Sequence, residues 1–406
     1  MKVTFLVYNI YGMGGTVRTV ANTANFLAKQ GYQVDIISVR RTRRTPMFEL
    51  DKRINLKPIF DARRGMLFGA NTPKYKKFIK KILMKIPSLF IDKSEDLYHM
   101  FNFFVDLKII NAIRKVKEGV FITTIPSFNV LSASFASKDL ILIGQEHKYF
   151  NGYHPRLQKK ITRHYKKLDS LICLTDSEVK VYKGILQESN TKLYKIENAT
   201  QMPNFSSSQK EKTVIAAGRF VHEKGFDMLI KSFETVVSKH PDWKLKIFGA
   251  GEEEKTLREL IFSKKLYNNV FLMPKTNNIL EEMSNSSIYA LSSRQESFGM
   301  VVVEAMSVGV PCVSFACPGP VEIISHNKDG ILVEQGNTDD FASSLLYLIE
   351  KEEIRIKMGL TARKNVKRYS FDTLGKKWKI MLEELRSEKK QGSFQVISKT
   401  SDKKLI

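Results

Sequence analysis

The sequence predicts an α/β protein made of two Rossmann-like halves, each a doubly wound parallel sheet with helices on both faces. The chain has 406 residues, which is too long for one ordinary domain. An alternation of short apolar strands and amphipathic helices begins at the N-terminus and begins again after a polar linker at residues 202–209. Both series open with a strand and a loop, which is the pattern of a βαβ unit.

The first half begins with a buried strand at 3–8, a glycine loop, a helix at 17–30 that ends at Gly31, and a second strand at 34–38. Further apolar runs predict strands at 120–124, 140–143 and 171–174. We assign residues 1–200 to an N-terminal domain that contains a basic insertion at about 40–118.

The second half repeats this organisation over residues 201–370. Strands are expected at 213–217, 243–248, 270–273, 287–291 and 311–314, and helices at 227–240, 253–264 and 301–308. A further helix is expected at 371–390 and a frayed tail at 391–406.

Composition narrows the class of protein. Hydrophobic residues make up 43% of the chain, which excludes a disordered protein. No apolar run reaches eighteen residues, so no transmembrane helix is expected, and the N-terminus is typical of a strand and not of a signal peptide. Three cysteines do not make a disulfide framework and favour a reducing compartment, the cytosol: Cys173, Cys312 and Cys317. No metal-ligand spacing is found.

The charge points to an anionic partner. Lys and Arg number 66 against 42 Asp and Glu, a net charge of +24. Residues 40–118 hold 20 of these basic residues and only 8 acidic ones, so half of the excess lies in one segment. Such concentration does not suit a nucleic-acid-binding protein with a uniformly basic groove.

The glycine loop Gly12-Met-Gly-Gly15 lies between a strand and a helix, where backbone approaches a phosphate easily. It is equally compatible with a plain tight turn. Its spacing is not Gly-x-Gly-x-x-Gly, and arginines follow the second strand where a dinucleotide-binding fold has an acidic residue. A nicotinamide dehydrogenase is therefore disfavoured.

Arg219 and Lys224 lie at the end of a strand and just before a helix. Two cations at such a strand end suit a diphosphate leaving group, through charge-assisted hydrogen bonds. The alternative is two solvated surface cations.

Glu296 lies in a loop before a helix, and the backbone N–H groups of residues 297–301 are free to meet phosphate oxygens. Glu304 follows eight residues later within an apolar stretch, where a carboxylate is costly without a partner. Ribose hydroxyls are suitable donors; an internal cap or pair is the alternative.

Taken together, Arg219, Lys224, the Glu-x7-Glu pattern of Glu296 and Glu304, and the glycine loop resemble a family 4 glycosyltransferase of the GT-B fold, of the bacterial cell-envelope type. The likeness covers residues 214–371 and, more weakly, 1–40 and 140–200. It implies two Rossmann-like domains facing a cleft, a final helix that crosses back to the N-terminal domain, a nucleotide-sugar donor, retention of anomeric configuration, and no metal ion or cofactor.

The resemblance also implies residue roles. Arg219 and Lys224 would hold the diphosphate, Glu296 would contact the sugar hydroxyls, and Glu304 would bind the ribose. Gly14 and Gly15 would let the N-terminal loop close over the diphosphate. Backbone N–H groups would reach the sugar and phosphate from Ser297, Phe298, Gly299, Met300 and Val301.

The resemblance also implies a catalytic histidine in the N-terminal domain. His147 follows a strand directly and is the best match, with Glu146 as a residue that would orient it. His154 and His164 lie in helical or turn regions and are less suitable. The expected catalytic set is His147, Glu296, Arg219 and Lys224.

Residues 74–86 form a basic amphipathic pattern. The apolar positions Tyr75, Phe78, Ile79, Ile82, Leu83 and Ile86 line one helical face. The membrane or acceptor contacts expected from this helix are Lys74, Lys77, Lys80, Lys81 and Lys85. Such a helix suits an anionic membrane or a phosphate polymer; a helix packed on the core with solvated lysines is the alternative.

The sequence therefore predicts a retaining, metal-independent hexosyltransferase that uses a nucleoside-diphosphate sugar, with UDP as the expected nucleotide. The expected acceptor is a cell-envelope glycan, either a lipid-linked oligosaccharide or a teichoic-acid-type polymer, at the inner face of the cell membrane. Nucleic acid is not an expected partner, and no oligomeric state is predicted. Two alternatives stay open, a GT-B-fold sugar-nucleotide 2-epimerase and a non-enzymatic anionic-polymer-binding protein, although the second leaves Glu296 and Glu304 without a role.

Overall fold

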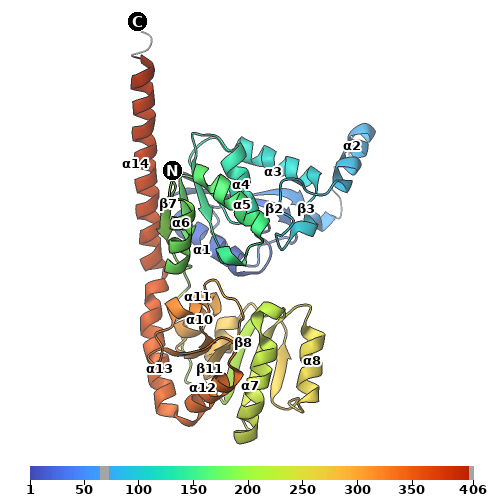
Figure 1. Ribbon diagram of the computed structural model, residues 1–406, viewed down its shortest axis with the longest axis vertical. Coiled ribbons are helices and arrows are strands. Elements are labelled where there is room, and N and C mark those ends of the chain that lie inside the picture. The colour runs from blue at the N-terminus through green and yellow to red at the C-terminus, as the bar shows by residue number, and fades with distance from the viewer. Residues whose placement is uncertain (65–72, 402–406) are drawn as a thin grey trace. The chain divides into compact units, whose positions relative to one another are not determined.

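The computed structural model describes residues 1–64 and 73–401. They form two compact units: residues 1–196 with the C-terminal segment from Gly375 make unit 1, and residues 197–374 make unit 2. Each unit contains one parallel sheet flanked by helices (Figure 1). The predicted α/β fold class with two parallel-sheet halves is confirmed.

The sheet of unit 1 has the strand order β3-β2-β1-β4-β5-β6-β7, and every pair of neighbours is parallel. The order reverses between β1 and β4, which is the topological switch point of the sheet. The strands are β1 (Lys2–Val7), β2 (Gln33–Arg41), β3 (Asn55–Asp61), β4 (Val120–Thr123), β5 (Ile141–Gln145), β6 (Ser170–Cys173) and β7 (Lys192–Lys195).

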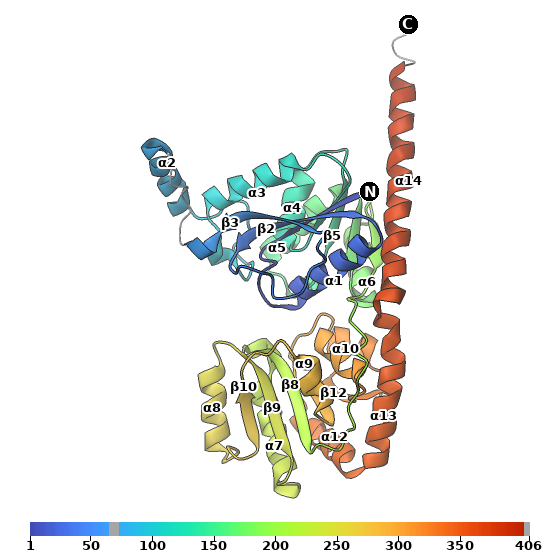
Figure 2. The same cartoon turned by 180° about the vertical axis from the view of Figure 1, so that it is seen from behind.

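Two apolar cores cover the two faces of this sheet. Val3 and Phe5 of β1 face the core that includes α1 and α14, whereas Leu6 faces the core under α3, α4 and α5 (Figure 2). Alternate residues of a strand point to opposite faces, and both faces are buried, so β1 is an almost continuous apolar run. The helices of unit 1 are α1 (Gly15–Lys29), α2 (Lys74–Lys85), α3 (Phe103–Lys115), α4 (Pro126–Phe135), α5 (Pro155–His164) and α6 (Asp176–Ile185).

Helix α14 (Phe371–Ser401) begins in unit 2 and belongs to unit 1 from Gly375 on. Trp378, Met381 and Leu382 are buried in the core of unit 1. The helix expected at 371–390 therefore runs further, to Ser401. The buried turns of α14 nucleate the helix, and extending a helix that already exists costs little free energy for each added residue. The extension therefore continues past Gly392 although glycine has a low helix propensity.

The segment 40–118, expected as an insertion, supplies the edge strand β3 and the covering helix α3 as well as α2. Strand β3 contains Pro58 and is largely half-exposed, because it lies at the sheet edge, so it lacks the apolar run of a central strand. Helix α3 begins after Asn102, whose side chain accepts the Val105 N–H at 3.0 Å.

Unit 2 repeats the same topology. Its strand order is β10-β9-β8-β11-β12-β13, and the switch point lies between β8 and β11. The strands are β8 (Thr213–Arg219), β9 (Lys244–Ala250), β10 (Val270–Met273), β11 (Ile288–Leu291), β12 (Cys312–Phe315) and β13 (Gly330–Val333). The helices are α7 (Phe226–Lys239), α8 (Glu254–Ser263), α9 (Ile279–Ser284), α10 (Met300–Ser307), α11 (Pro318–Ile323), α12 (Thr338–Glu350) and α13 (Glu352–Asn365).

Two findings concern the whole described chain. Among residues 1–64 and 73–401, none of the helices combines the length and the apolar character needed to span a membrane. Within the same residues, no group of three or more His, Cys, Asp or Glu side chains lies close enough together to hold a metal ion.

Candidate functional site

The residues expected to bind the donor in unit 2 lie on loops that follow β8 and β11. Arg219 is the last residue of β8, and Lys224 lies in a short 3₁₀ helix, His222–Lys224, directly after it. The loop that carries Glu296 follows β11. Strands β8 and β11 border the switch point, and ligands of doubly wound sheets bind outside the carboxyl ends of strands at that position. The fold therefore gathers these residues where a ligand is expected.

Lys224 and Glu296 form an ion pair, with Nζ 2.6 Å from Oε2. Their side chains are 22% and 15% exposed, so the pair is partly shielded from water. From the sequence, Lys224 was expected to hold the diphosphate of the donor and Glu296 to contact its sugar hydroxyls. In the structure the two side chains are in direct contact. Arg219 is exposed, and its side chain makes no ion pair or hydrogen bond with any residue that the structure describes. The charge of Lys224 is thus already neutralised by Glu296, whereas the charge of Arg219 is available to bind an anion.

A glycine holds the Lys224 segment against the end of β11. Gly225 has a left-handed φ of +61°, and a Cβ at this position would lie 2.1 Å from the Ser292 carbonyl oxygen. The Ser292 hydroxyl also donates a hydrogen bond to the Lys224 carbonyl at 3.1 Å. Only glycine permits this close approach, which fixes the backbone of Lys224.

Arg294 is a positioning residue that sequence reasoning missed. Its guanidinium binds both carboxylate oxygens of Asp227 at 2.8 and 2.7 Å and donates to the His222 carbonyl at 2.7 Å. Burial alone would raise the pKa of Asp227, but the hydrogen bonds from Arg294 and other favourable contacts lower it. Because 67 residues separate the two partners, no local sequence pattern signals this pair.

The N-terminus of α10 offers unbonded backbone donors. Gly299 precedes the helix with a left-handed φ of +98°, and the first turn has neither a side-chain cap nor an acidic residue. The N–H groups of Met300 and Val301 have no acceptor within the helix. Phe298 is buried, its ring packs edge-to-face on Tyr369, and its backbone lies against Gly319, where a Cβ would come within 2.2 Å of the Phe298 carbonyl oxygen. Ser297 is half-buried.

Glu304 lies in the second turn of α10 and is 2% exposed. Its neighbours in the helix, Val303 and Ala305, are fully buried. A carboxylate that is buried among apolar side chains is stable only when it is hydrogen-bonded. The sequence analysis expected a hydrogen-bonding partner for Glu304 for the same reason.

In unit 1 the glycine loop follows β1, which borders the switch point of that sheet. Gly14 has a φ of +150°, and a Cβ at Gly14 or Gly15 would meet nothing within 4 Å. At Gly12, by contrast, a Cβ would come within 3.2 Å of the Asn9 side chain. The space beside Gly14 and Gly15 is therefore open, at the unblocked N-terminus of α1.

His147 follows β5, which lies next to β4 and so one strand from the switch point. Its Nε2 is buried and has no hydrogen-bond partner among the described residues. Burial lowers the pKa of His147 to about 4, so the imidazole is neutral near pH 7. His154 and His164 have local roles: His154 caps α5 by accepting the Arg156 N–H at 3.3 Å, and His164 contacts Ser134 at 3.2 Å.

The expectation that Glu146 orients His147 is wrong. The oxygens of Glu146 accept hydrogen bonds from Tyr153 at 2.7 Å, from Asn129 at 3.2 Å and from Tyr165. Glu146 is buried in the core, and burial raises its pKa to about 8 against the effect of the tyrosine hydroxyls. Neighbouring residues of an extended segment point to opposite sides, which separates the two side chains.

The lysines expected at a membrane or acceptor lie on α2. Lys81 and Lys85 are exposed, and Lys80 is half-buried with Nζ 4.9 Å from the centre of the Phe104 ring. The side chains of Lys74 and Lys77 lie outside the described residues.

Known proteins match this chain as follows. Residues 197–365 match the family described as glycosyl transferases group 1. An uncharacterized glycosyltransferase of Haemophilus influenzae is 29% identical over 385 residues, which cover 94% of this chain and 99% of that protein. A poly(ribitol-phosphate) α-N-acetylglucosaminyltransferase of Staphylococcus aureus is 29% identical over 249 residues, 60% of this chain and 50% of that protein.

Among solved structures, that of a mutant of S. aureus TarM in complex with fondaparinux, α-GlcNAc-glycerol and UDP superposes with a TM-score of 0.75 at 18% identity, over 94% of this chain and 99% of that chain. The expected GT-B fold is thereby confirmed. The chain therefore has the GT-B fold, its residues 197–365 match glycosyl transferases group 1, and bacterial glycosyltransferases are among its relatives.

Proposed function

We propose that this protein is a retaining, metal-independent family 4 glycosyltransferase that transfers a sugar from a nucleoside-diphosphate sugar to a cell-envelope glycan. The observation that carries the proposal is the grouping of Arg219, the Lys224–Glu296 pair and the α10 N-terminus at the switch point of unit 2. UDP is the proposed nucleotide, supported by its presence in the TarM complex.

The ion pair suggests how the donor is received. A diphosphate would take Lys224 from Glu296, and the released Glu296 would accept hydrogen bonds from the sugar hydroxyls. In this exchange neither group is left without a hydrogen-bond partner, because Lys224 gains the diphosphate oxygens and Glu296 gains the sugar hydroxyls as donors. Arg219 adds a second positive charge, and both cations stabilise the negative charge that grows as the diphosphate leaves. Two such cations supply the charge that a metal ion supplies in other transferases.

The α10 N-terminus completes the proposed donor site. Unbonded N–H groups at residues 297–301 would donate to phosphate or sugar oxygens, aided by the positive end of the helix dipole. Glu304 would accept hydrogen bonds from the ribose hydroxyls. The eight-residue separation of Glu296 and Glu304 matches the family 4 pattern and supports the proposed retention of configuration.

In unit 1, described by itself, the residues proposed to contact a ligand are Gly14, Gly15 and His147. The open space beside the two glycines suits a phosphate at the N-terminus of α1. His147 is neutral near pH 7, and its Nε2 is available to a sugar hydroxyl. A neutral imidazole positions a hydroxyl without adding charge next to the reacting sugar.

The proposed acceptor is a lipid-linked oligosaccharide or a teichoic-acid-type polymer, and the proposed place of work is the inner face of the cell membrane. The relative in S. aureus that acts on poly(ribitol phosphate) supports the polymer. The net charge of +24 suits an acceptor that carries phosphate groups.

A donor screen tests the proposal. The protein is incubated with UDP-, GDP- and ADP-sugars, with and without poly(ribitol phosphate), and released nucleotide and anomeric configuration are measured. We expect UDP release that depends on the acceptor, and a product with the configuration of the donor. An altered nucleotide sugar formed without acceptor would instead identify a 2-epimerase, and an inverted product would contradict retention.

A further inference from the structure

Helix α2 turns apolar side chains toward solvent. Tyr75, Phe78, Ile79 and Ile82 are 62%, 66%, 51% and 47% exposed. Their spacing of three, four and seven residues places them in one stripe along the helix. An apolar stripe of this kind is normally buried. Its exposure in a helix that projects from unit 1 (Figure 1) indicates a surface that binds a partner or a membrane.

The opposite side of α2 faces the protein. Lys80 lies over the ring of Phe104 in α3, and Lys108 of α3 approaches the same ring at 5.6 Å. Burial and the nearby charge of Lys108 lower the pKa of Lys80. Leu83 and Met84 are half-buried. The face of α2 that carries Lys80 therefore meets α3, and the exposed side chains of Phe78, Ile79 and Ile82 lie on another face of the helix.

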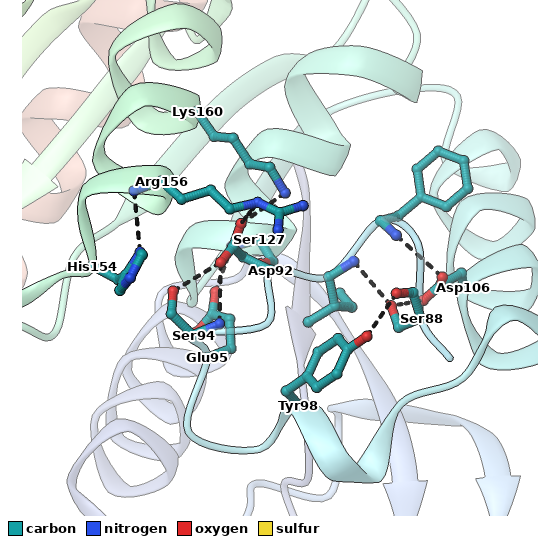
Figure 3. A network of polar contacts seen from close by, with 12 residues as sticks. Ser88, Asp92, Ser94, Glu95, Tyr98, Asp106, Ser127, His154, Arg156 and Lys160 are labelled. Atoms are coloured by element: carbon teal, nitrogen blue, oxygen red, sulfur yellow. Dashed lines mark hydrogen bonds and ion pairs between the residues drawn. The ribbon is translucent and has the colours of Figure 1, made fainter. Parts of the chain in front are cut away.

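The chain that follows α2 is held firmly to α3. Asp106 of α3 accepts hydrogen bonds from the Ser88 hydroxyl at 2.7 Å and from the Leu89 and Phe90 N–H groups at 2.8 and 3.3 Å (Figure 3). The Phe103 N–H also donates to the carbonyl of Ile86, the residue after α2, at 3.0 Å. The end of α2 is thus pinned at a defined place beside α3.

A second set of contacts ties the next residues to α4 and α5. Asp92 pairs with Lys160 at 2.8 Å and lies 3.7 Å from Arg156, both on α5 (Figure 3). Glu95 accepts the N–H of Ser127, in α4, at 2.8 Å. The chain that follows α2 is therefore held in place by several contacts. An element that is already ordered loses little conformational entropy when it binds.

We propose that α2 docks unit 1 on an anionic phospholipid bilayer, with the stripe Tyr75, Phe78, Ile79 and Ile82 inserted among the acyl chains. Lys81 and Lys85 are exposed and would lie at the level of the lipid phosphates. Apolar burial and attraction to anionic lipid together give stable attachment where either alone is marginal.

The apolar stripe distinguishes a bilayer from a soluble phosphate polymer. A polymer would be bound by the lysines alone and would leave two aromatic and two isoleucine side chains in water. A bilayer removes them from water, which is worth about 25 cal/mol for each Å² buried. The inference is independent of the proposed donor chemistry, because it rests on unit 1 alone.

The test uses co-sedimentation of the full chain with vesicles of phosphatidylcholine, with or without phosphatidylglycerol. The apolar variant is Phe78→Ser/Ile79→Ser and the basic variant is Lys81→Gln/Lys85→Gln. The matched control is Phe262→Ser/Leu360→Ser, which removes two apolar side chains of unit 2 that are 74% and 67% exposed.

We expect the wild type to bind vesicles that contain phosphatidylglycerol. The apolar variant should bind them more than tenfold more weakly. At low salt the basic variant should bind about 25-fold more weakly, at about fivefold for each lysine. The control should bind like the wild type, and all three variants should melt at the wild-type temperature, since the replaced side chains are exposed.

Three results would overturn the inference. The first is that the wild type and the apolar variant bind vesicles equally, while only the basic variant loses binding to soluble polyphosphate. This result would identify a site for a phosphate polymer. The second is a wild-type dimer on gel filtration that the apolar variant converts to a monomer without any vesicle binding, which would identify a protein interface. The third is a collapse of the melting temperature in the apolar variant, which would show that the stripe is core packing.

Discussion

Replacing Lys224 by alanine separates its proposed role in catalysis from its role in holding Glu296. In the free protein the two residues form the 2.6 Å ion pair, and the substitution removes the cation. Glu296, which is 15% exposed, is then left without that partner. In the donor complex the same substitution removes one of the two cations that face the leaving diphosphate.

The two effects differ in size. Unit charges 2.6 Å apart attract each other by about 6 kcal/mol at an effective dielectric constant of about 20. Desolvation offsets most of this, and both side chains are partly exposed, so we expect the free energy of unfolding to fall by only about 1–2 kcal/mol. Loss of a cation that acts on the developing charge should lower kcat by on the order of 10²-fold, about 2.7 kcal/mol of transition-state stabilisation. Arg219 should keep the remaining activity measurable.

The assay is the initial rate of nucleotide release at varied donor concentration, with melting temperature measured in parallel. Lys224→Ala should lower kcat about 10²-fold and raise KM, because the released Glu296 carboxylate repels the phosphates. In the double variant Lys224→Ala/Glu296→Gln the repelling carboxylate is absent, so KM should fall part of the way back to the wild-type value. Its kcat should stay as low as that of Lys224→Ala. Lys239→Ala, an exposed lysine at the end of α7, is the matched control and should leave both constants unchanged.

The reasoning fails if Lys224→Ala keeps a kcat within threefold of the wild type and only KM rises. Lys224 would then bind the ground state and the transition state equally, and would not stabilise the leaving group.

Three further predictions follow from the same structure. Activity should survive excess chelator, since Arg219 and Lys224 supply the positive charge; complete loss that added manganese or magnesium restores would contradict this. Glu146→Gln should flatten the fall of melting temperature between about pH 4.5 and pH 8. The raised pKa of Glu146, about 8 against a usual 4.5, contributes stability that is present below pH 4.5 and lost as pH rises through 8, and glutamine cannot ionise; an unchanged pH profile would be the contrary result. Gly225→Ala should cost more than about 2 kcal/mol of unfolding free energy, because its Cβ would lie 2.1 Å from a carbonyl oxygen. The helical Gly184→Ala, with open space around it, should be neutral or stabilising, and equal melting of the two variants would contradict the account.

The sequence was sufficient to predict the repeated βαβ units and the strands that carry the candidate site. Strands β1 and β8 are buried on both faces and therefore stand out as apolar runs that end in glycine-containing loops. The sequence analysis assigned no strand at β3, β7 or β13; β3 and β7 are half-exposed edge strands of mixed composition, whereas β13 is a short, mostly buried run of four residues.

The site was predicted as a set of residue types but not as a set of contacts. The Lys224–Glu296 pair joins residues 72 positions apart, and Arg294 meets Asp227 over 67 positions. Such pairs arise from the strand order, which places β8 beside β11, and no local pattern encodes that order. The same limit explains the error at Glu146, whose partner Tyr165 lies 19 residues away.

The direction that α2 faces could not be predicted either. A hydrophobic stripe in a sequence is compatible with a face turned to the core or a face turned outward. The contact between Lys80 and Phe104 settles the orientation, and it depends on where α3 lies in the fold.

The central claim is that the switch point of unit 2 binds a nucleoside diphosphate through Arg219 and Lys224. Calorimetric titration of the protein with UDP tests it most directly, with Arg219→Ala, Lys224→Ala and the control Lys239→Ala alongside. The account predicts binding by the wild type and the control, and binding at least tenfold weaker in the Arg219 and Lys224 variants, about 1.4 kcal/mol each. UDP binding that neither substitution weakens, or no binding of any nucleoside diphosphate by the wild type, would contradict it.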